Sequence, residues 1–216
     1  ITFSVSEKSS PDTGATPDVS YSQSGDLLDD DQQSKEVASY SATSATDSAD
    51  PIITDATTYD VDDDGDVGAA TLTASEAMDG NLGGTPSDFE IGGTDASTVN
   101  AQEYTDDSGA TDSDSGDKFR VELADNSEID GTDAKQVNYD GSSATDGNSN
   151  NLVELTDQDV SETDGATPQA VEVKTFDQDS DGKTDAAQIE FSESVDDSTL
   201  SDPAFFEIGQ TDAGSF

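Results

Sequence analysis

The stretch that decides the fold is YDVDDDGDVGAATLTASE at residues 59–76, because it occurs again as FDQDSDGKTDAAQIEFSE at residues 176–193. The tetrapeptide FEIG recurs at the same spacing of 117 residues, at 89–92 and at 206–209. Self-similarity at a fixed spacing is typical of chains built from structural units in series. The sequence therefore predicts a tandem-repeat protein.

The repeat also predicts the boundaries of the units, because a proline opens equivalent segments at 51 and at 168. Residues 51–167 are expected to form one complete unit. Residues 168–216 correspond to the front half of a second unit, and residues 1–50 correspond to the rear half of another. At the spacing of 117, the leading ITFSVSE falls on KFRVELA at 118–124.

Short strands account for the apolar residues of each unit. Ala70, Leu72 and Ala74 alternate with polar residues, and the second copy has Ala187, Ile189 and Phe191 at the same places. Alternation with a period of two predicts strands with one buried face. Clusters of Gly, Asp, Ser and Thr separate these strands, as turns require. About seven short strands in each unit favour an antiparallel two-sheet sandwich, so the predicted fold class is all-β.

The composition excludes several functions. The chain has 51 acidic and 7 basic residues, a formal net charge of -44, and neither Cys nor His. A chain with so few cations is not expected to bind nucleic acid. Without His or Cys it lacks the usual catalytic triads and zinc ligands, and we expect no enzymatic activity. It also has no apolar run long enough to span a membrane. An acidic, disordered chain is the alternative that composition leaves open.

The order of motifs resembles a known family of repeats. A proline, a strand, a D-x-D-x-D-G turn, FSESVDD at 191–197 and FFEIG at 205–209 follow one another in the second copy. This order resembles the Ig-like repeats of prokaryotic cell-surface and filament proteins, and the acidic surface resembles that of haloarchaeal proteins. The resemblance implies tandem Ig-like β-sandwiches in a rod-like series, outside the cell or on its surface.

The sharpest chemical motif is a ladder of aspartates in the D-x-D-x-D-G turns. Calcium takes six to eight oxygen ligands, and alternate carboxylates with a glycine at the bend can wrap a loop around one ion. An EF-hand would need Glu at the twelfth loop position, where the chain has Thr71 and Gln188. A solvated acidic turn is the other interpretation. The predicted Ca²⁺ ligands are Asp60, Asp62, Asp64 and Asp66 in the first copy, and Asp177, Asp179, Asp181 and Asp185 in the second.

The incomplete units at the two ends of the sequence lead to a prediction of assembly. We expect residues 168–216 of one molecule to be completed by residues 1–50 of another copy, head to tail, which gives an open fibre. The alternative is that the sequence is an excerpt of one long polypeptide, in which adjoining sequence supplies the same strands covalently and also gives a filament of Ig-like units. The predicted function is therefore a structural segment of an extracellular, calcium-stabilised, halophilic filament. The alternatives are an adhesin or S-layer stalk and a spacer domain of a secreted hydrolase.

Overall fold

The fold is known from a computed structural model, and it is built from strands and short turns. The described residues are 2, 4–6, 8–25, 27–28, 30, 35–62, 64–79, 82, 86–100, 104–105, 111–112, 116–124, 129–130, 134–141, 143–156, 160–208 and 211–212. Helical structure in these residues consists of three 3-10 turns, η1 (Pro86–Asp88), η2 (Asp197–Thr199) and η3 (Pro203–Phe205). The predicted all-β class is confirmed.

The central part of the chain forms two larger sheets and two small ones. The five-stranded sheet has the order β14 (Glu162–Asp164), β3 (Ile53–Tyr59), β5 (Ala69–Ala74), β11 (Lys118–Glu122) and β8 (Thr98–Asn100). The three-stranded sheet has the order β13 (Val137–Tyr139), β6 (Phe89–Ile91) and β7 (Thr94–Asp95). The two-stranded sheets are β4 (Asp66–Val67) with β12 (Ile129–Asp130), and β9 (Tyr104–Thr105) with β10 (Thr111–Asp112).

Aromatic side chains join the two larger sheets at one hydrophobic core. Phe119 of β11 meets Phe89 of β6 edge to face, with ring centroids 5.7 Å apart, and the ring centroid of Tyr139 of β13 lies 4.6 Å from that of Phe89. All three rings are buried. Among the described residues, the members of this core lie between Ile53 and Leu155.

Strand β5 is buried on both faces, whereas alternation predicted one. The side chains expected in the core are buried, namely Ala70, Leu72 and Ala74. Ala69 and Thr71 on the opposite face are buried as well. Because β5 lies between β3 and β11, the larger Tyr59 and Arg120 sit directly across from these two small residues. Cross-strand neighbours of this size cover small side chains between them.

One strand pair differs from the antiparallel prediction. β14 runs parallel to β3, with Glu162 opposite Ala56 and Asp164 opposite Thr58. The physical reason is that β13 belongs to the other sheet, so the chain crosses over before it reaches the edge of β3. The chain therefore enters the central unit at the Ile53 end of β3 and leaves it after Asp164, beside the other end of that strand.

The C-terminal segment repeats the front half of the central unit. β15 (Ala170–Phe176) pairs with β16 (Ala186–Phe191) in the register of β3 with β5, including the irregularity near the start of the first strand. Downstream, η3 precedes β17 (Glu207–Ile208) and β18 (Thr211–Asp212), as η1 precedes β6 and β7. Ile208 faces Thr211 just as Ile91 faces Thr94. The spacing of 117 residues is thus reproduced pair by pair.

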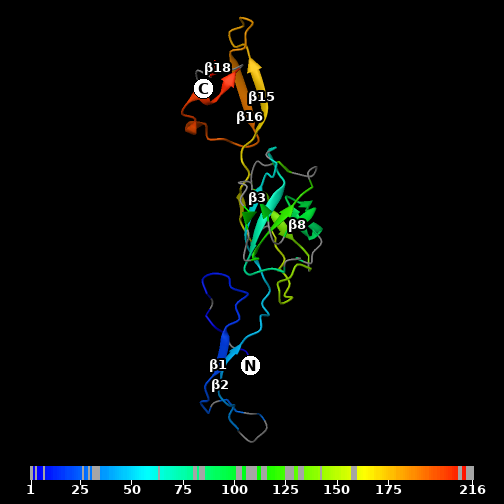
Figure 1. Ribbon diagram of the computed structural model, residues 1–216, viewed down its shortest axis with the longest axis vertical. Coiled ribbons are helices and arrows are strands. Elements are labelled where there is room, and N and C mark those ends of the chain that lie inside the picture. The colour runs from blue at the N-terminus through cyan, green and yellow to red at the C-terminus, as the bar shows by residue number, and fades with distance from the viewer. Residues whose placement is uncertain are drawn as a thin grey trace.

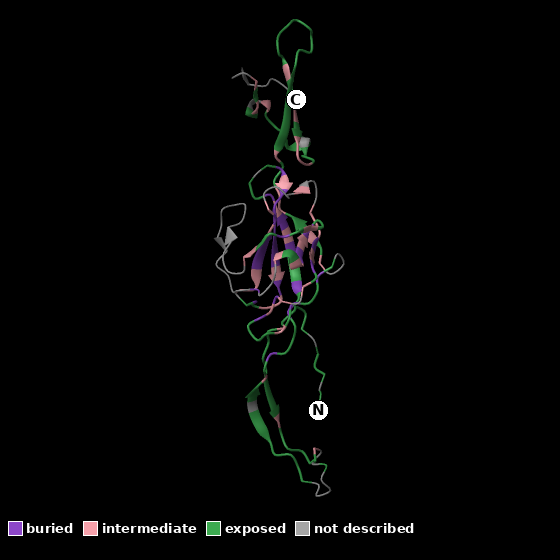
Figure 2. Cartoon of the chain, turned by 90° about the vertical axis from the view of Figure 1, so that its right-hand side faces the viewer, coloured by how far each residue is buried: buried purple, intermediate pink, exposed green. Residues whose placement is uncertain are grey.

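The N-terminal segment contains β1 (Asp18–Tyr21) paired with β2 (Tyr40–Ser44). The two terminal sheets lie on opposite sides of the central unit (Figure 1). Buried residues concentrate in the central unit, while both terminal sheets are mostly exposed (Figure 2). None of the helices among the described residues has the length and apolar character needed to cross a membrane.

Candidate metal centres

Three groups of carboxylates lie close enough together to hold a cation. Within each group, one oxygen from every residue lies within 4.8 Å of the others. The groups are Asp60 with Asp62 and Asp64, Asp177 with Asp179 and Asp185, and Asp47 with Glu76 and Asp146. Clusters of this kind could hold a metal ion, and two of them fall in the predicted aspartate ladders.

The first ladder is organised by its leading aspartate. Asp60 is 1% exposed, and its two carboxylate oxygens accept the backbone N–H groups of Asp64 at 3.3 Å and Gly65 at 2.8 Å. Gly65 has φ +102°, a left-handed conformation that residues with a side chain rarely adopt. The turn thereby brings the carboxylates of Asp62 and Asp64 beside that of Asp60.

The second ladder has the same backbone arrangement in an exposed setting. Asp177 accepts the N–H groups of Asp181 at 3.1 Å and Gly182 at 2.8 Å. Asp185 accepts the N–H of Gln178 at 2.8 Å, which holds its carboxylate near those of Asp177 and Asp179. The recurrence shows that the Asp and Gly spacing specifies this turn whether or not its first carboxylate is buried.

Two of the eight predicted ligands lie outside the clusters. Asp66 begins β4, and its N–H bonds to Asp64. Asp181 binds the ammonium of Lys183 at 2.6 Å, so its charge is compensated within the turn. Lys183 stands at the position of Asp66 in the other copy. The second cluster uses Asp185 in place of Asp181.

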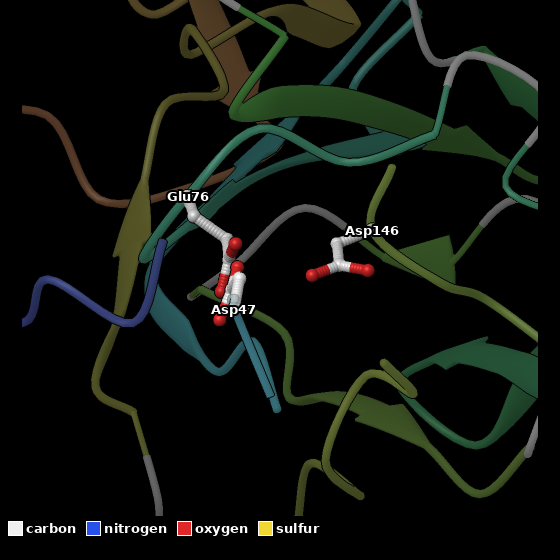
Figure 3. Close-up of side chains that lie close together, drawn as sticks. All are labelled: Asp47, Glu76 and Asp146. Carbon is white, nitrogen blue, oxygen red and sulfur yellow. The ribbon is translucent and has the colours of Figure 1, made fainter. Parts of the chain in front are cut away.

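The third cluster joins segments that are distant in the sequence. Asp47 lies just before the central unit, Glu76 follows β5, and Asp146 lies in the turn after β13. Figure 3 shows the carboxylates of Asp47 and Glu76 side by side, with that of Asp146 nearby. Asp47 is 8% exposed and Asp146 is 2% exposed, so this cluster is the most buried of the three.

Hydrogen bonds stabilise the ionised form of Asp146. Burial raises its pKa, but the backbone and side chain of Asn150 and the backbone of Asn148 donate hydrogen bonds that together lower the pKa below its ordinary value. The distances to these donors are 2.7–2.8 Å. The side chain of Asn148 also reaches Asp47, at 3.3 Å. The turn at 146–150 therefore anchors two of the three carboxylates.

The surroundings of Glu76, unlike those of Asp146, raise the pKa of its carboxyl group. Burial raises its pKa, a hydrogen bond from Thr13 opposes the increase, and the charge of Asp47 and then that of Asp146 add to it. Its Oε1 is buried and accepts no hydrogen bond from the described residues. The ionised form of Glu76 is thus disfavoured unless a cation compensates its charge. Without a cation, the carboxyl group tends to keep its proton.

This third cluster was not among the sites predicted from the sequence. Its residues come from three segments, and only the fold brings them together. One signal was available in the repeat, because Asp47 and Glu76 recur as Asp164 and Glu193. The structure strengthens that correspondence. Asp47 accepts the N–H of Ala49 at 3.1 Å, and Asp164 accepts the N–H of Ala166 at 3.0 Å.

Clusters mark both junctions of the central unit. At the N-terminal junction, a Cβ on Gly14 would lie 2.9 Å from a carboxylate oxygen of Glu76. At the C-terminal junction, a Cβ on Gly65 would lie 2.8 Å from the Cβ of Ser192. Both glycines therefore permit close approach between consecutive segments. A cation at either place would lie where two segments of the chain meet.

Comparisons of the chain with protein-family models, with curated proteins and with solved structures find no match. The features of the molecule that bear on function are therefore the internal repeat, the exposed terminal sheets and the carboxylate clusters.

Proposed function

We propose that this chain is a structural segment of an extracellular filament or surface fibre, in which Ig-like units assemble head to tail. Calcium stabilises these units, and the acidic surface suits them to high salt. The observation that carries the proposal is the exposed sheet β15–β16. It has the strand register of β3–β5, and within the described residues it is a two-stranded sheet, whereas β3–β5 lies inside a sheet of five strands.

Matching residues are more exposed on β15–β16 than on β3–β5. Ala56 of β3 is 0% exposed, and its counterpart on β15, Val173, is 60% exposed. Across the strand pair, Leu72 is buried, whereas its counterpart Ile189 is only half-buried. Isolated two-stranded sheets are at best marginally stable in water, and exposed edges pair readily with other strands. Additional strands covering β15–β16 would stabilise the C-terminal segment.

The N-terminal segment corresponds in sequence to residues 118–167, which carry β11, β13 and β14 in the central unit. In the central unit, β13 and β14 follow the front half and complete it. Residues 1–50 correspond to this rear half, so a second copy of the chain can supply it. Because β3 and β14 are parallel, the chain enters and leaves the central unit at opposite ends of β3. This path of the chain favours units that follow one another in series over two units that close on each other.

Calcium is the cation that the ladders suit best. Their ligands are carboxylate oxygens on flexible turns, the donors and setting that Ca²⁺ prefers, whereas Mg²⁺ demands a stricter octahedron. Asp60, Asp62 and Asp64 would supply the first set, and Asp177, Asp179 and Asp185 the second. Backbone carbonyls and water would complete each shell. A cation beside Gly65 would also stabilise the contact between consecutive segments.

High salt would reduce the repulsion between these acidic copies. The formal charge of -44 gives strong self-repulsion at low ionic strength, but the Debye length falls to about 3 Å at 1 M salt. Such screening allows acidic copies to approach one another. An environment of this kind is expected for the cell surface of a halophile.

Electron microscopy of the chain with two matched variants tests the proposal. Val173→Asp places a charge on the face of β15 that the second copy would cover, and Lys174→Gln changes the net charge by the same amount on the opposite face. At about 1 M KCl with calcium, we expect fibres from the unsubstituted chain and from Lys174→Gln, and none from Val173→Asp. Dispersed single molecules in all three samples would refute the proposal.

A further inference from the structure

The segments that carry Glu76 and Asp146 are held together by backbone pairing, although they are far apart in the sequence. Met78 and Asp146 form an isolated antiparallel bridge, and the N–H of Asp79 donates to the carbonyl oxygen of Thr145 at 2.8 Å. Met78 is also buried in the hydrophobic core of the central unit. The fold itself therefore places these two carboxylates near each other.

Neutral donors use only part of the acceptor capacity of Asp47 and Asp146. Asp146 accepts the N–H groups of Asn148 and Asn150 and the side-chain amide of Asn150. Asp47 accepts the N–H of Ala49 at 3.1 Å and the side-chain amide of Asn148 at 3.3 Å. A carboxylate has about four acceptor positions, so both groups retain lone pairs. Because none of these donors is charged, they stabilise the two carboxylates without neutralising them.

One oxygen of Glu76 is buried without a donor. No described residue donates a hydrogen bond to its Oε1. Figure 3 shows the carboxylate of Glu76 beside that of Asp47. A buried oxygen without a donor is costly, and a bound ion or water is a common reason for one in a native protein. Because other carboxylates lie beside this oxygen, a cation would satisfy it and also compensate their charge, which water does not do.

We propose that Asp47, Glu76 and Asp146 bind one Ca²⁺ ion, which fastens the chain segment before Pro51 to the central unit. One oxygen from each of the three residues lies within 4.8 Å of the others. With ligands at about 2.3–2.6 Å, one Ca²⁺ ion spans oxygens as far as about 5 Å apart. Backbone carbonyls and water complete the coordination shell.

Calcium fits this cluster better than magnesium does. Mg²⁺ gives up its water reluctantly, and protein sites usually bind it through only one or two carboxylates. The third cluster offers three carboxylates, and Asp47 and Asp146 are almost fully buried. A cation that exchanges most of its water for carboxylate oxygens is therefore favoured.

An ion in the third cluster would have a different effect from an ion in a ladder. The ligands of each ladder lie within one turn, so an ion there stabilises that turn. The ligands of the third cluster lie on three segments, and the neighbouring Ser75 hydroxyl lies 2.5 Å from that of Thr13. The ion would thus tie the preceding part of the chain to the central unit. This inference goes beyond the proposed filament and does not depend on assembly between copies.

Calorimetric titration with CaCl₂ tests the site in a full chain whose ladders carry Asp62→Asn, Asp64→Asn, Asp179→Asn and Asp185→Asn. At about 1 M KCl, we expect this ladder-free chain to bind one Ca²⁺ ion. Adding Glu76→Gln should weaken binding more than about tenfold, since even residues that only support a metal ligand contribute this much. Adding Asp50→Asn instead should leave binding unchanged, because it removes the same charge from an exposed position close to Asp47.

Hydrogen exchange measures the fastening itself. Calcium should slow the exchange of the Ala49 and Asn148 amides in the ladder-free chain, and this protection should disappear with Glu76→Gln. Circular dichroism checks that the variant retains its strands. Asp47→Asn, which lies outside the strands, gives a second variant with the same expected loss of binding and protection.

Three results would overturn the third site. The first is equal calcium affinity with and without Glu76→Gln and Asp47→Asn. The second is an equal loss of affinity from Asp50→Asn, which would show that calcium responds only to the net negative charge. The third is no calcium binding to the ladder-free chain. If the unsubstituted chain still binds calcium in that case, the ladders of the proposed function remain intact.

Discussion

The carboxylate of Asp60 accepts the backbone N–H of Gly65 at 2.8 Å, and Asp177 accepts that of Gly182 at the same distance in the second copy. Asp60 is buried, whereas Asp177 is exposed. The turn therefore keeps its geometry in two different environments. This independence makes each ladder a self-contained candidate site, and it makes the second copy a natural control for the first.

Replacing Asp62 and Asp64 together with Asn should remove the calcium-dependent part of the stability of the central unit. A ligand that binds only the folded form stabilises it by about 2.7 kcal/mol at one hundred times its Kd. Thermal unfolding in low-salt buffer, with calcium and with a chelator, measures this increment. Asp55→Asn, at an exposed position on β3 outside the clusters, should retain it. If the chelator does not alter the melting of the unsubstituted chain, the ladders are acidic turns without a metal.

Gly65→Ala should destabilise the protein more than Gly182→Ala. Both glycines have positive φ, +102° and +89°, so each substitution places a side chain in a conformation that costs about 1–2 kcal/mol. At Gly65 the new Cβ would also lie 2.8 Å from that of Ser192, while Gly182 has open space around it. Thermal unfolding of the two variants measures the difference. Equal losses would show that the contact with Ser192 contributes nothing.

Glu76→Gln should stabilise the protein at neutral pH when divalent cations are absent. Burial raises the folded-state pKa of Glu76 above its ordinary value of 4.5, so the folded protein retains a proton that the unfolded chain has lost. The stability contributed by protonated Glu76 is present below pH 4.5 and is lost as pH rises through the folded pKa. The gain from glutamine should therefore be largest above that pKa and disappear in acid.

Denaturant unfolding of this variant and of the unsubstituted chain across that pH range provides the measurement. Calcium supplies a second comparison, because glutamine would remove one negative ligand from the cluster with Asp47 and Asp146. If Glu76→Gln and the unsubstituted chain have the same stability at every pH, the folded protein does not disfavour the ionised form of Glu76.

The candidate ladders could be predicted from the sequence because their spacing is local. Three aspartates at alternate positions before a glycine can converge within one turn, and this occurs at Asp60, Asp62 and Asp64. Asp181 and Asp185 were both predicted as ligands of the second ladder, and the structure groups Asp185 with Asp177 and Asp179, while Asp181 binds Lys183. The cluster at Asp47 depends on tertiary structure, which spacing along the chain does not encode.

The fold shows the same division between local and distant information. Period-two alternation predicted β5 and β16, and the repeat related them to each other. It did not reveal the parallel placement of β14, since strand direction depends on which sheet receives the preceding strand.

Lowering the salt concentration should loosen the terminal segments before the central unit. The formal charge of -44 is spread over the whole chain, but the buried core that resists expansion lies in the central unit. Hydrogen exchange along a falling KCl series, without divalent ions, would follow each segment separately. We expect β15–β16 to lose protection at higher salt than β3–β5. Simultaneous loss in both segments would indicate one cooperative unit and would contradict the repeat-based description.

Sedimentation velocity tests head-to-tail assembly most directly, because it measures the size of the particles in solution without a substitution or a label. The unsubstituted chain would be examined at about 1 M KCl with calcium, over a wide range of protein concentration. We predict that the mean sedimentation coefficient rises continuously with concentration, as an open series of copies requires. A single species with the mass of one chain at every concentration would contradict the account.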